Sequence, residues 1–139
     1  MAVVHLSTAS RNAAVSAIAG LVDADAGPGK VLIYDGTIPA DAGTAVTTQV
    51  LLATVILGDP AYAAPSAGTV TGADPASVNA VASGTAAWFR QTDNSGDVVM
   101  DGDVTATGGG GTMTLSTVSL TTGSPVDITS LSITMPSGA

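Results

Sequence analysis

Side chains that could do chemistry are few and scattered in this 139-residue chain. His5 is the single histidine, cysteine is absent, and all eleven acidic residues are aspartate. A serine or threonine nucleophile needs a base beside it, and no Gly-x-Ser-x-Gly elbow marks such a site. Since His5 falls in an apolar N-terminal arm that we expect to be flexible, we interpret it as a structural or solvent-facing residue. We therefore expect a non-enzymatic protein without a catalytic residue or cofactor.

One acidic stretch has the beginnings of a calcium loop. Asp93-Asn94-Ser95-Gly96-Asp97 spaces oxygen ligands at alternate positions. The stretch lacks the glycine at the sixth loop position and the glutamate at the twelfth. Aspartate and asparagine also favour tight turns, because they hydrogen-bond to nearby backbone. We interpret the stretch as a hairpin connection and predict no metal site, with a cation at Asp93 and Asp97 as the alternative.

Two further patterns could indicate chemistry. Asp101 and Asp103 flank Gly102, and paired carboxylates act as acid and base in glycosidases. No aromatic sugar platform accompanies them, so we interpret them as a solvated strand face. The run Gly108–Gly111 lacks the lysine and helix start that a phosphate-binding loop requires.

Composition excludes several partners. Three basic residues face eleven acids, which gives a net charge of −8. Nucleic-acid binding depends on lysine and arginine to neutralise phosphates, and anionic membrane surfaces attract basic segments. No apolar run approaches the 18 residues or so of a spanning helix. We expect neither nucleic-acid nor membrane partners.

The chain length predicts a single domain over residues 1–139, with a short arm at about 1–7 and one helix at about 8–25. Val15, Ile18, Leu21 and Val22 form an apolar stripe at helical spacing, and Gly27-Pro28-Gly29 ends the helix.

Turn-separated apolar segments follow without further helices. Strands are predicted over 30–35, 48–57, 85–92, 98–104, 112–118 and 126–135, with weaker ones near 69–72 and 77–82. Gly102 predicts a bulge or a close backbone approach, and a phase slip at Thr129-Ser130 predicts a bulge. The fold class is therefore mainly β: an antiparallel β-sandwich or jelly roll with one N-terminal helix.

Trp88-Phe89-Arg90 holds half of the four aromatic residues. Tryptophan and arginine are enriched at interface hot spots, which makes Trp88 and Arg90 candidates for partner binding. The favoured interpretation is a core segment, with Phe89 buried and Trp88 half covered.

An ordered set of short motifs resembles short tailed-bacteriophage virion structural proteins that are encoded near the capsid genes. The motifs cover residues 8 to 136 and include Ser10-Arg11-Asn12-Ala13, Val31-Leu32-Ile33-Tyr34-Asp35-Gly36, Leu57-Gly58-Asp59-Pro60-Ala61-Tyr62, Trp88-Phe89-Arg90, Val98-Val99-Met100-Asp101-Gly102 and Ile133-Thr134-Met135-Pro136.

The resemblance implies a structural role in the virion, after assembly in the host cytoplasm. The leading hypothesis is a capsid decoration, or cement, protein that stabilises the outside of the head. Its partners would be the major capsid protein and copies of itself in a homo-oligomer. The alternatives are a neck, tail or fibre component, or a receptor- or glycan-binding β module. For partner binding we predict Val3, Val4, His5, Leu6, Tyr62, Trp88 and Arg90.

Overall fold

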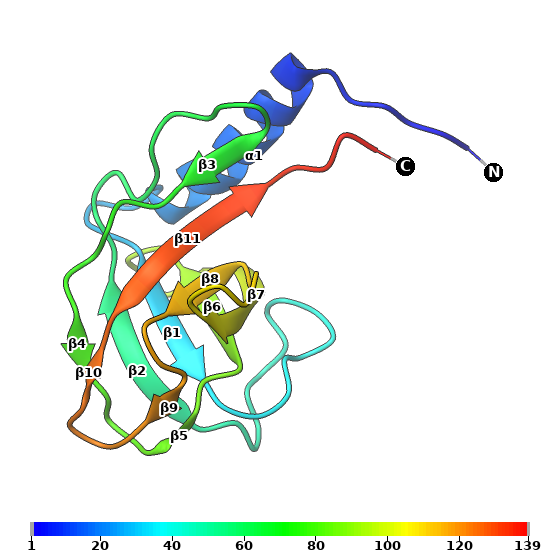
Figure 1. The fold of residues 1–139 in the computed structure, drawn as a ribbon. Coiled ribbons are helices and arrows are strands. Elements are labelled where there is room, and N and C mark those ends of the chain that lie inside the picture. Colours follow the sequence, from blue (N-terminus) through cyan, green and yellow to red (C-terminus); the bar gives the residue numbers. More distant parts are fainter. Residues whose placement is uncertain (1, 139) are drawn as a thin grey trace.

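The computed structural model describes residues 2–138 and consists of one helix and three β-sheets (Figure 1). The helix, α1 (Thr8–Val22), begins where Ser7 accepts a hydrogen bond from the backbone N–H of Ser10 at 3.1 Å. Its buried face is Val15, Ala19 and Val22. The predicted stripe is wrong at Leu21, which is 56 % exposed because the buried face runs through Ala19 instead. Neither the length nor the hydropathy of α1 would let it cross a membrane.

The main sheet has seven strands in the order β2-β1-β6-β7-β8-β11-β3. Its strands are β1 (Lys30–Tyr34), β2 (Leu51–Ile56), β3 (Thr69–Thr71), β6 (Trp88–Thr92), β7 (Val98–Ala106), β8 (Met113–Leu115) and β11 (Ile128–Thr134). Two small ribbons pair β4 (Val78–Asn79) with β10 (Pro125–Val126), and β5 (Gly84–Thr85) with β9 (Ser119–Leu120).

The molecule is mainly β with one N-terminal helix and a sandwich-like arrangement, as the sequence predicts. The β4–β10 ribbon lies beside the outer edge of β2, where the N–H of Val81 donates to the carbonyl of Leu52 at 2.8 Å. Because β10 leads directly into β11, the far part of the sheet folds back towards β2 (Figure 1). The largest side chains enclosed are Trp88, Phe89, Ile33, Leu52, Met113 and Leu115.

The expectation of a purely antiparallel fold is wrong at one place. β7 and β8 are parallel neighbours, with Val104 opposite Met113. Parallel neighbours usually need a long crossover. Here the glycine run 108–111 makes a short one, with positive φ at Gly108 and Gly110. The N–H of Gly111 donates to the side-chain oxygen of Thr105 at 3.0 Å, which secures the loop.

Two local predictions are confirmed. β11 shifts register against β8 between Ile128 and Ser130, at the predicted phase slip. A Cβ on Gly102 would lie 2.6 Å from the ring of Phe89, so this glycine marks a close approach. Two predicted strands are instead interrupted: 85–92 divides into β5 and β6, and 126–135 into β10 and β11.

Candidate functional site

The two ends of the chain run side by side and project from the body (Figure 1). His5 pairs with Gly138 in an antiparallel bridge, and the N–H of Leu6 donates to the carbonyl of Ser137 at 2.8 Å. We call residues 2–6 and 136–138 together the terminal pair. The arm that the sequence predicts to be flexible is therefore paired with the C-terminal tail. The sequence gives no signal of this pairing, because Ser137 and Gly138 have no apolar pattern.

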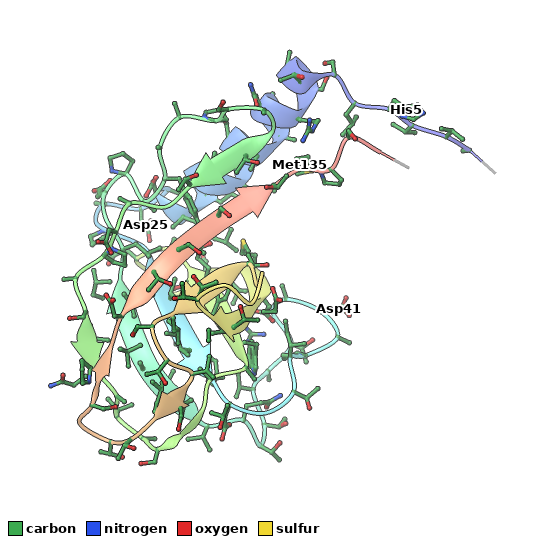
Figure 2. The ribbon with its side chains drawn as sticks, viewed as in Figure 1. His5, Asp25, Asp41 and Met135 are labelled. Atoms are coloured by element: carbon green, nitrogen blue, oxygen red, sulfur yellow. The ribbon has the colours of Figure 1, made fainter. Side chains whose placement is uncertain are left out.

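The base of the terminal pair is attached to α1. The Nε of Arg11 donates to the carbonyl of Met135 at 2.8 Å, just before the C-terminal tail begins. Figure 2 shows Met135 at this base and His5 further out on the arm. The helix thus fixes where both chain ends leave the body.

The terminal pair presents apolar side chains to solvent. Val3 is 62 % exposed, Val4 63 % and Leu6 37 %. His5 is also exposed. Within residues 2–138 there is no group of histidine and acidic side chains that could hold a metal ion. The chemistry available here is apolar contact and backbone pairing.

Trp88 and Arg90 lie inside the domain. Trp88 is 1 % exposed, stacks on Tyr34 with ring centroids 4.6 Å apart, and donates from Nε1 to the carbonyl of Asp35. Arg90 lies over the Trp88 ring at 5.4 Å and forms an ion pair with Asp101. The hydrogen bonds that Arg90 donates to the Asp101 carboxylate raise the pKa of Arg90. The core interpretation of this segment is confirmed, although Trp88 is fully rather than half covered.

Tyr62 is also buried. Its hydroxyl donates to the Oε1 of Gln91 at 2.9 Å. Burial raises the pKa of Tyr62 to about 12, so the phenol stays protonated. In this fold Tyr62, Trp88 and Arg90 are buried, with 6 %, 1 % and 7 % of their surface exposed, so they are interior residues rather than the exposed binding residues that were predicted.

The stretch 93–97 forms the predicted turn. Oδ1 of Asp93 accepts hydrogen bonds from the Oγ of Ser95 at 2.8 Å and from the N–H groups of Gly96 and Asp97, each at 2.9 Å. The Ser95 hydroxyl, followed by these backbone donors, lowers the pKa of Asp93. The carboxylate organises the loop that joins β6 to β7.

The solvated-face interpretation of Asp101 and Asp103 is wrong for Asp101. Its side chain is 5 % exposed and is bound by Arg90. Asp103 instead accepts hydrogen bonds from the N–H and the hydroxyl of Thr112, at 2.9 and 2.7 Å, which lower its pKa. Both carboxylates are structural, because each has its own donor.

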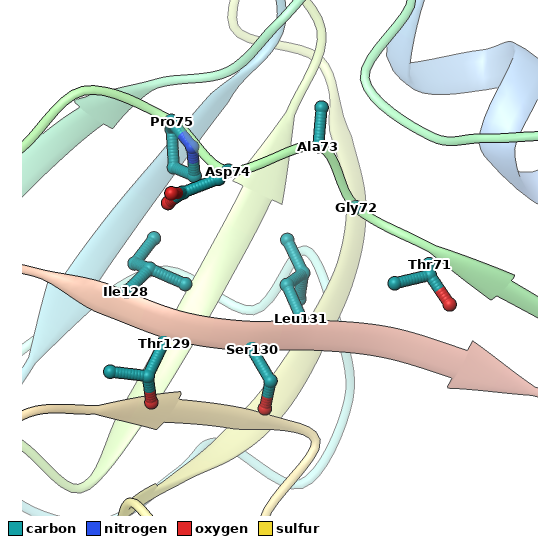
Figure 3. Close-up of a pocket in the computed structure, with 9 residues that line it drawn as sticks. All are labelled: Thr71, Gly72, Ala73, Asp74, Pro75, Ile128, Thr129, Ser130 and Leu131. Carbon is teal, nitrogen blue, oxygen red and sulfur yellow. The ribbon is translucent and has the colours of Figure 1, made fainter.

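A shallow groove of about 110 Å³ separates the 71–75 segment from β11 (Figure 3). Ile128 and Leu131 point into it, whereas Thr129 and Ser130 point to the other side of β11. Both of these hydroxyls lie 2.7 Å from the hydroxyl of Thr114. The groove is therefore lined on the β11 side by apolar groups.

Of the residues predicted to bind partners, the structure gathers Val3, Val4, His5 and Leu6 on one exposed feature. Partner binding by these four stays a prediction. Comparisons of the chain with protein-family models, curated proteins and solved structures found no match. The terminal pair is the candidate functional site on geometric grounds, because it combines exposure, apolar side chains and extended backbone.

Proposed function

We propose that this protein is a non-enzymatic structural component of a tailed-bacteriophage virion: a decoration, or cement, protein that binds the outside of the head. The terminal pair carries the proposal, because three of its apolar side chains are exposed and its backbone projects from the body (Figure 1). The ordered motifs that resemble phage virion proteins support the same role. The partners would be the major capsid protein and neighbouring copies of this chain, and the protein would reside in the virion after assembly in the host cytoplasm.

Backbone geometry supports docking by the arm. Leu6 directs its N–H to the C-terminal tail. In an extended strand successive N–H groups point to opposite sides, so the N–H of His5 faces away from the tail. An edge of this kind can accept a strand from a partner, with affinity from main-chain hydrogen bonds. The arm can therefore combine strand pairing with burial of Val3 and Val4.

Charge supports a protein shell as the surface contacted. The chain carries a net charge of −8, and the ion pair seen among residues 2–138, Arg90 with Asp101, is enclosed within the domain. Most acidic residues consequently have no cationic side chain of this protein to offset them. Complementary potentials speed association and suppress wrong partners. Basic patches on capsid subunits would meet this requirement.

The number of copies on tail-less heads tests the proposed location of the protein on the virion. Purified heads of the phage that encodes the chain would be analysed by quantitative mass spectrometry against the major capsid protein. Hundreds of copies per head are expected for a decoration protein. A few dozen copies or fewer, or loss with the tail, would contradict the proposal and indicate a neck, tail or fibre component.

A pair of valine substitutions tests the arm. We expect Val3→Ser with Val4→Ser to weaken binding to heads by at least about tenfold, since fully burying one such side chain contributes about 1.5 kcal/mol or more. Val81→Ser is the matched control, because Val81 is 64 % exposed on another part of the surface. Unfolding curves should coincide for all three proteins. If the double variant binds heads to the same extent as the wild-type protein, the arm makes no contact with the head.

A further inference from the structure

A second pocket, of about 220 Å³, lies between the C-terminal end of α1 and the β6–β7 hairpin. We call it the acidic pocket; its lining residues are Leu21, Ala24, Asp93, Asp97, Val98 and Val99. Leu21 is 56 % exposed and Val98 38 % exposed, although both are large apolar side chains. The pocket thus joins apolar walls to two carboxylates.

The end of the helix adds to the negative potential of the acidic pocket. The C-terminal end of a helix carries a partial negative charge, which basic side chains usually offset. The last turn of α1 has no basic residue, and Asp23 and Asp25 follow it. Lys30 is the cation beside the hairpin, and its Nζ donates to the carbonyl of Asn94 at 3.1 Å. Near this end of α1 and the hairpin, Lys30 is therefore outnumbered by Asp23, Asp25, Asp93 and Asp97.

Asp93 is one of the two acidic residues that line this pocket. It lines the cavity although only 6 % of its surface is exposed. Its three hydrogen bonds from the turn all end on Oδ1. Within residues 2–138, no hydrogen bond ends on Oδ2. This oxygen can accept a donor from outside the chain without disturbing the turn.

We propose that the acidic pocket binds a lysine or arginine side chain presented by a protein partner. The aliphatic stem would pack between Leu21 and Val98, as such stems do on apolar surface, and the cation would lie between Asp93 and Asp97. A calcium ion fits less well, because it takes six to eight oxygen ligands. The binding chemistry stands by itself, whereas the identity of the partner as a capsid subunit rests on the proposed function.

The test uses the full chain and a small cationic probe. Backbone amides would be followed by NMR during titration with Nα-acetyl-lysine methylamide, its neutral norleucine analogue, and calcium chloride. We expect saturable shifts with the lysine probe at Leu21, Ala24, Asp97, Val98 and Val99. Equal shifts with the norleucine analogue, shifts with calcium alone, or no saturable shifts would each overturn the proposal.

Two substitutions separate the contribution of the carboxylate charge to probe binding from the contribution of the apolar wall. Asp97→Asn should lower the affinity for the lysine probe roughly threefold at low salt, which is the effect of losing one exposed charge pair. Leu21→Ser should also lower the affinity for the lysine probe, because it removes the apolar wall of the pocket. Asp41→Asn is the matched control, since Asp41 lies on a separate exposed loop, far from Asp25 in Figure 2. Unchanged binding to Asp97→Asn would contradict the proposal.

The outcomes for the pocket and for the virion role remain distinguishable. The probe titration uses the isolated protein and does not depend on heads. If the probe binds and heads carry few copies, the pocket proposal survives and the decoration role fails. If heads carry hundreds of copies and the probe does not bind, the decoration role survives and the pocket proposal fails.

Discussion

Arg90 and Asp101 are joined by two parallel hydrogen bonds beneath the surface of the domain. Nε of Arg90 donates to Oδ1 of Asp101 and Nη2 to Oδ2, each at 2.7 Å. The two side chains are 8 % and 5 % exposed. Nη1 of Arg90 also donates to the carbonyl of Thr44 at 2.8 Å. This pair therefore connects β6, β7 and the loop that follows β1.

Breaking this pair from one side should destabilise the protein strongly. Asp101→Asn leaves a buried guanidinium without its counter-charge, which typically costs about 3–5 kcal/mol. We expect the double variant Arg90→Met with Asp101→Leu to lose less, because it buries no unpaired charge. Urea unfolding of the three proteins measures this. A double variant less stable than Asp101→Asn would contradict the explanation.

Tyr62 and Gln91 provide a second buried pair. The Nε2 of Gln91 is buried without a hydrogen-bond partner in the described chain, and Tyr62 is the partner of its Oε1. Tyr62→Phe should therefore cost about 1–3 kcal/mol, since it leaves the whole amide unsatisfied. Tyr62→Phe combined with Gln91→Leu should recover stability. Thermal unfolding of both variants tests this, and equal losses would show that packing, rather than the amide, sets the cost.

Glycine positions give two substitutions with opposite signs. Gly102→Ala would place a methyl group 2.6 Å from the Phe89 ring, so the ring or strand must move. Overpacking of this kind typically costs about 1–3 kcal/mol. Gly20→Ala lies in α1 with open space around it, and should stabilise by about 0.5–1 kcal/mol through helix propensity. Denaturant midpoints should move in opposite directions; a shift of the same sign would refute the contact argument.

Stability should fall on acidification because two turn carboxylates have lowered pKa values. The pKa values of Asp93 and Asp103 lie below the ordinary value of 3.8 in the folded protein. The folded state therefore holds their protons less tightly than the unfolded state does, and their stabilisation is complete only above 3.8. It decreases as the pH falls from about 5 and disappears below the folded pKa values.

Unfolding midpoints between about pH 2 and pH 7 would check this dependence, because this range extends from about two units below the unfolded pKa to about three units above it. Asp93→Asn and Asp103→Asn should each make the curve flatter at the acid end. Asp41→Asn removes the same charge from an exposed loop and controls for net charge. An Asp93→Asn curve as steep as the wild-type curve would show that the turn does not favour the ionised carboxylate.

Local features were predictable because short-range physics determines them. Ser7 can cap α1 because its side chain reaches an N–H three residues on, whatever the rest of the chain does. Asp93 likewise organises its own turn. The bulge near Thr129 was visible because the apolar residues change phase there.

The Arg90–Asp101 pair was not predictable from the hairpin alone. The end of the hairpin pairs Thr92 with Val98, and regular counting from there would place Arg90 opposite Met100. A register shift between Gln91 and Thr92 moves Asp101 into that place. This register shift of one residue therefore places Asp101 in a buried ion pair with Arg90 instead of on a solvated strand face. Arg90, held by Asp101, also lies over the Trp88 ring, so both side chains are interior residues.

The sequence by itself determined the mainly β class, the N-terminal helix, the turns and the low number of basic residues. These follow from composition, capping and periodicity, which act within a few residues. Only the tertiary structure decided the parallel pairing of β7 with β8, the pairing of the two chain ends and the acidic pocket. Each depends on segments far apart in sequence, such as Leu21 and Val98, whose meeting is set by packing of the whole core.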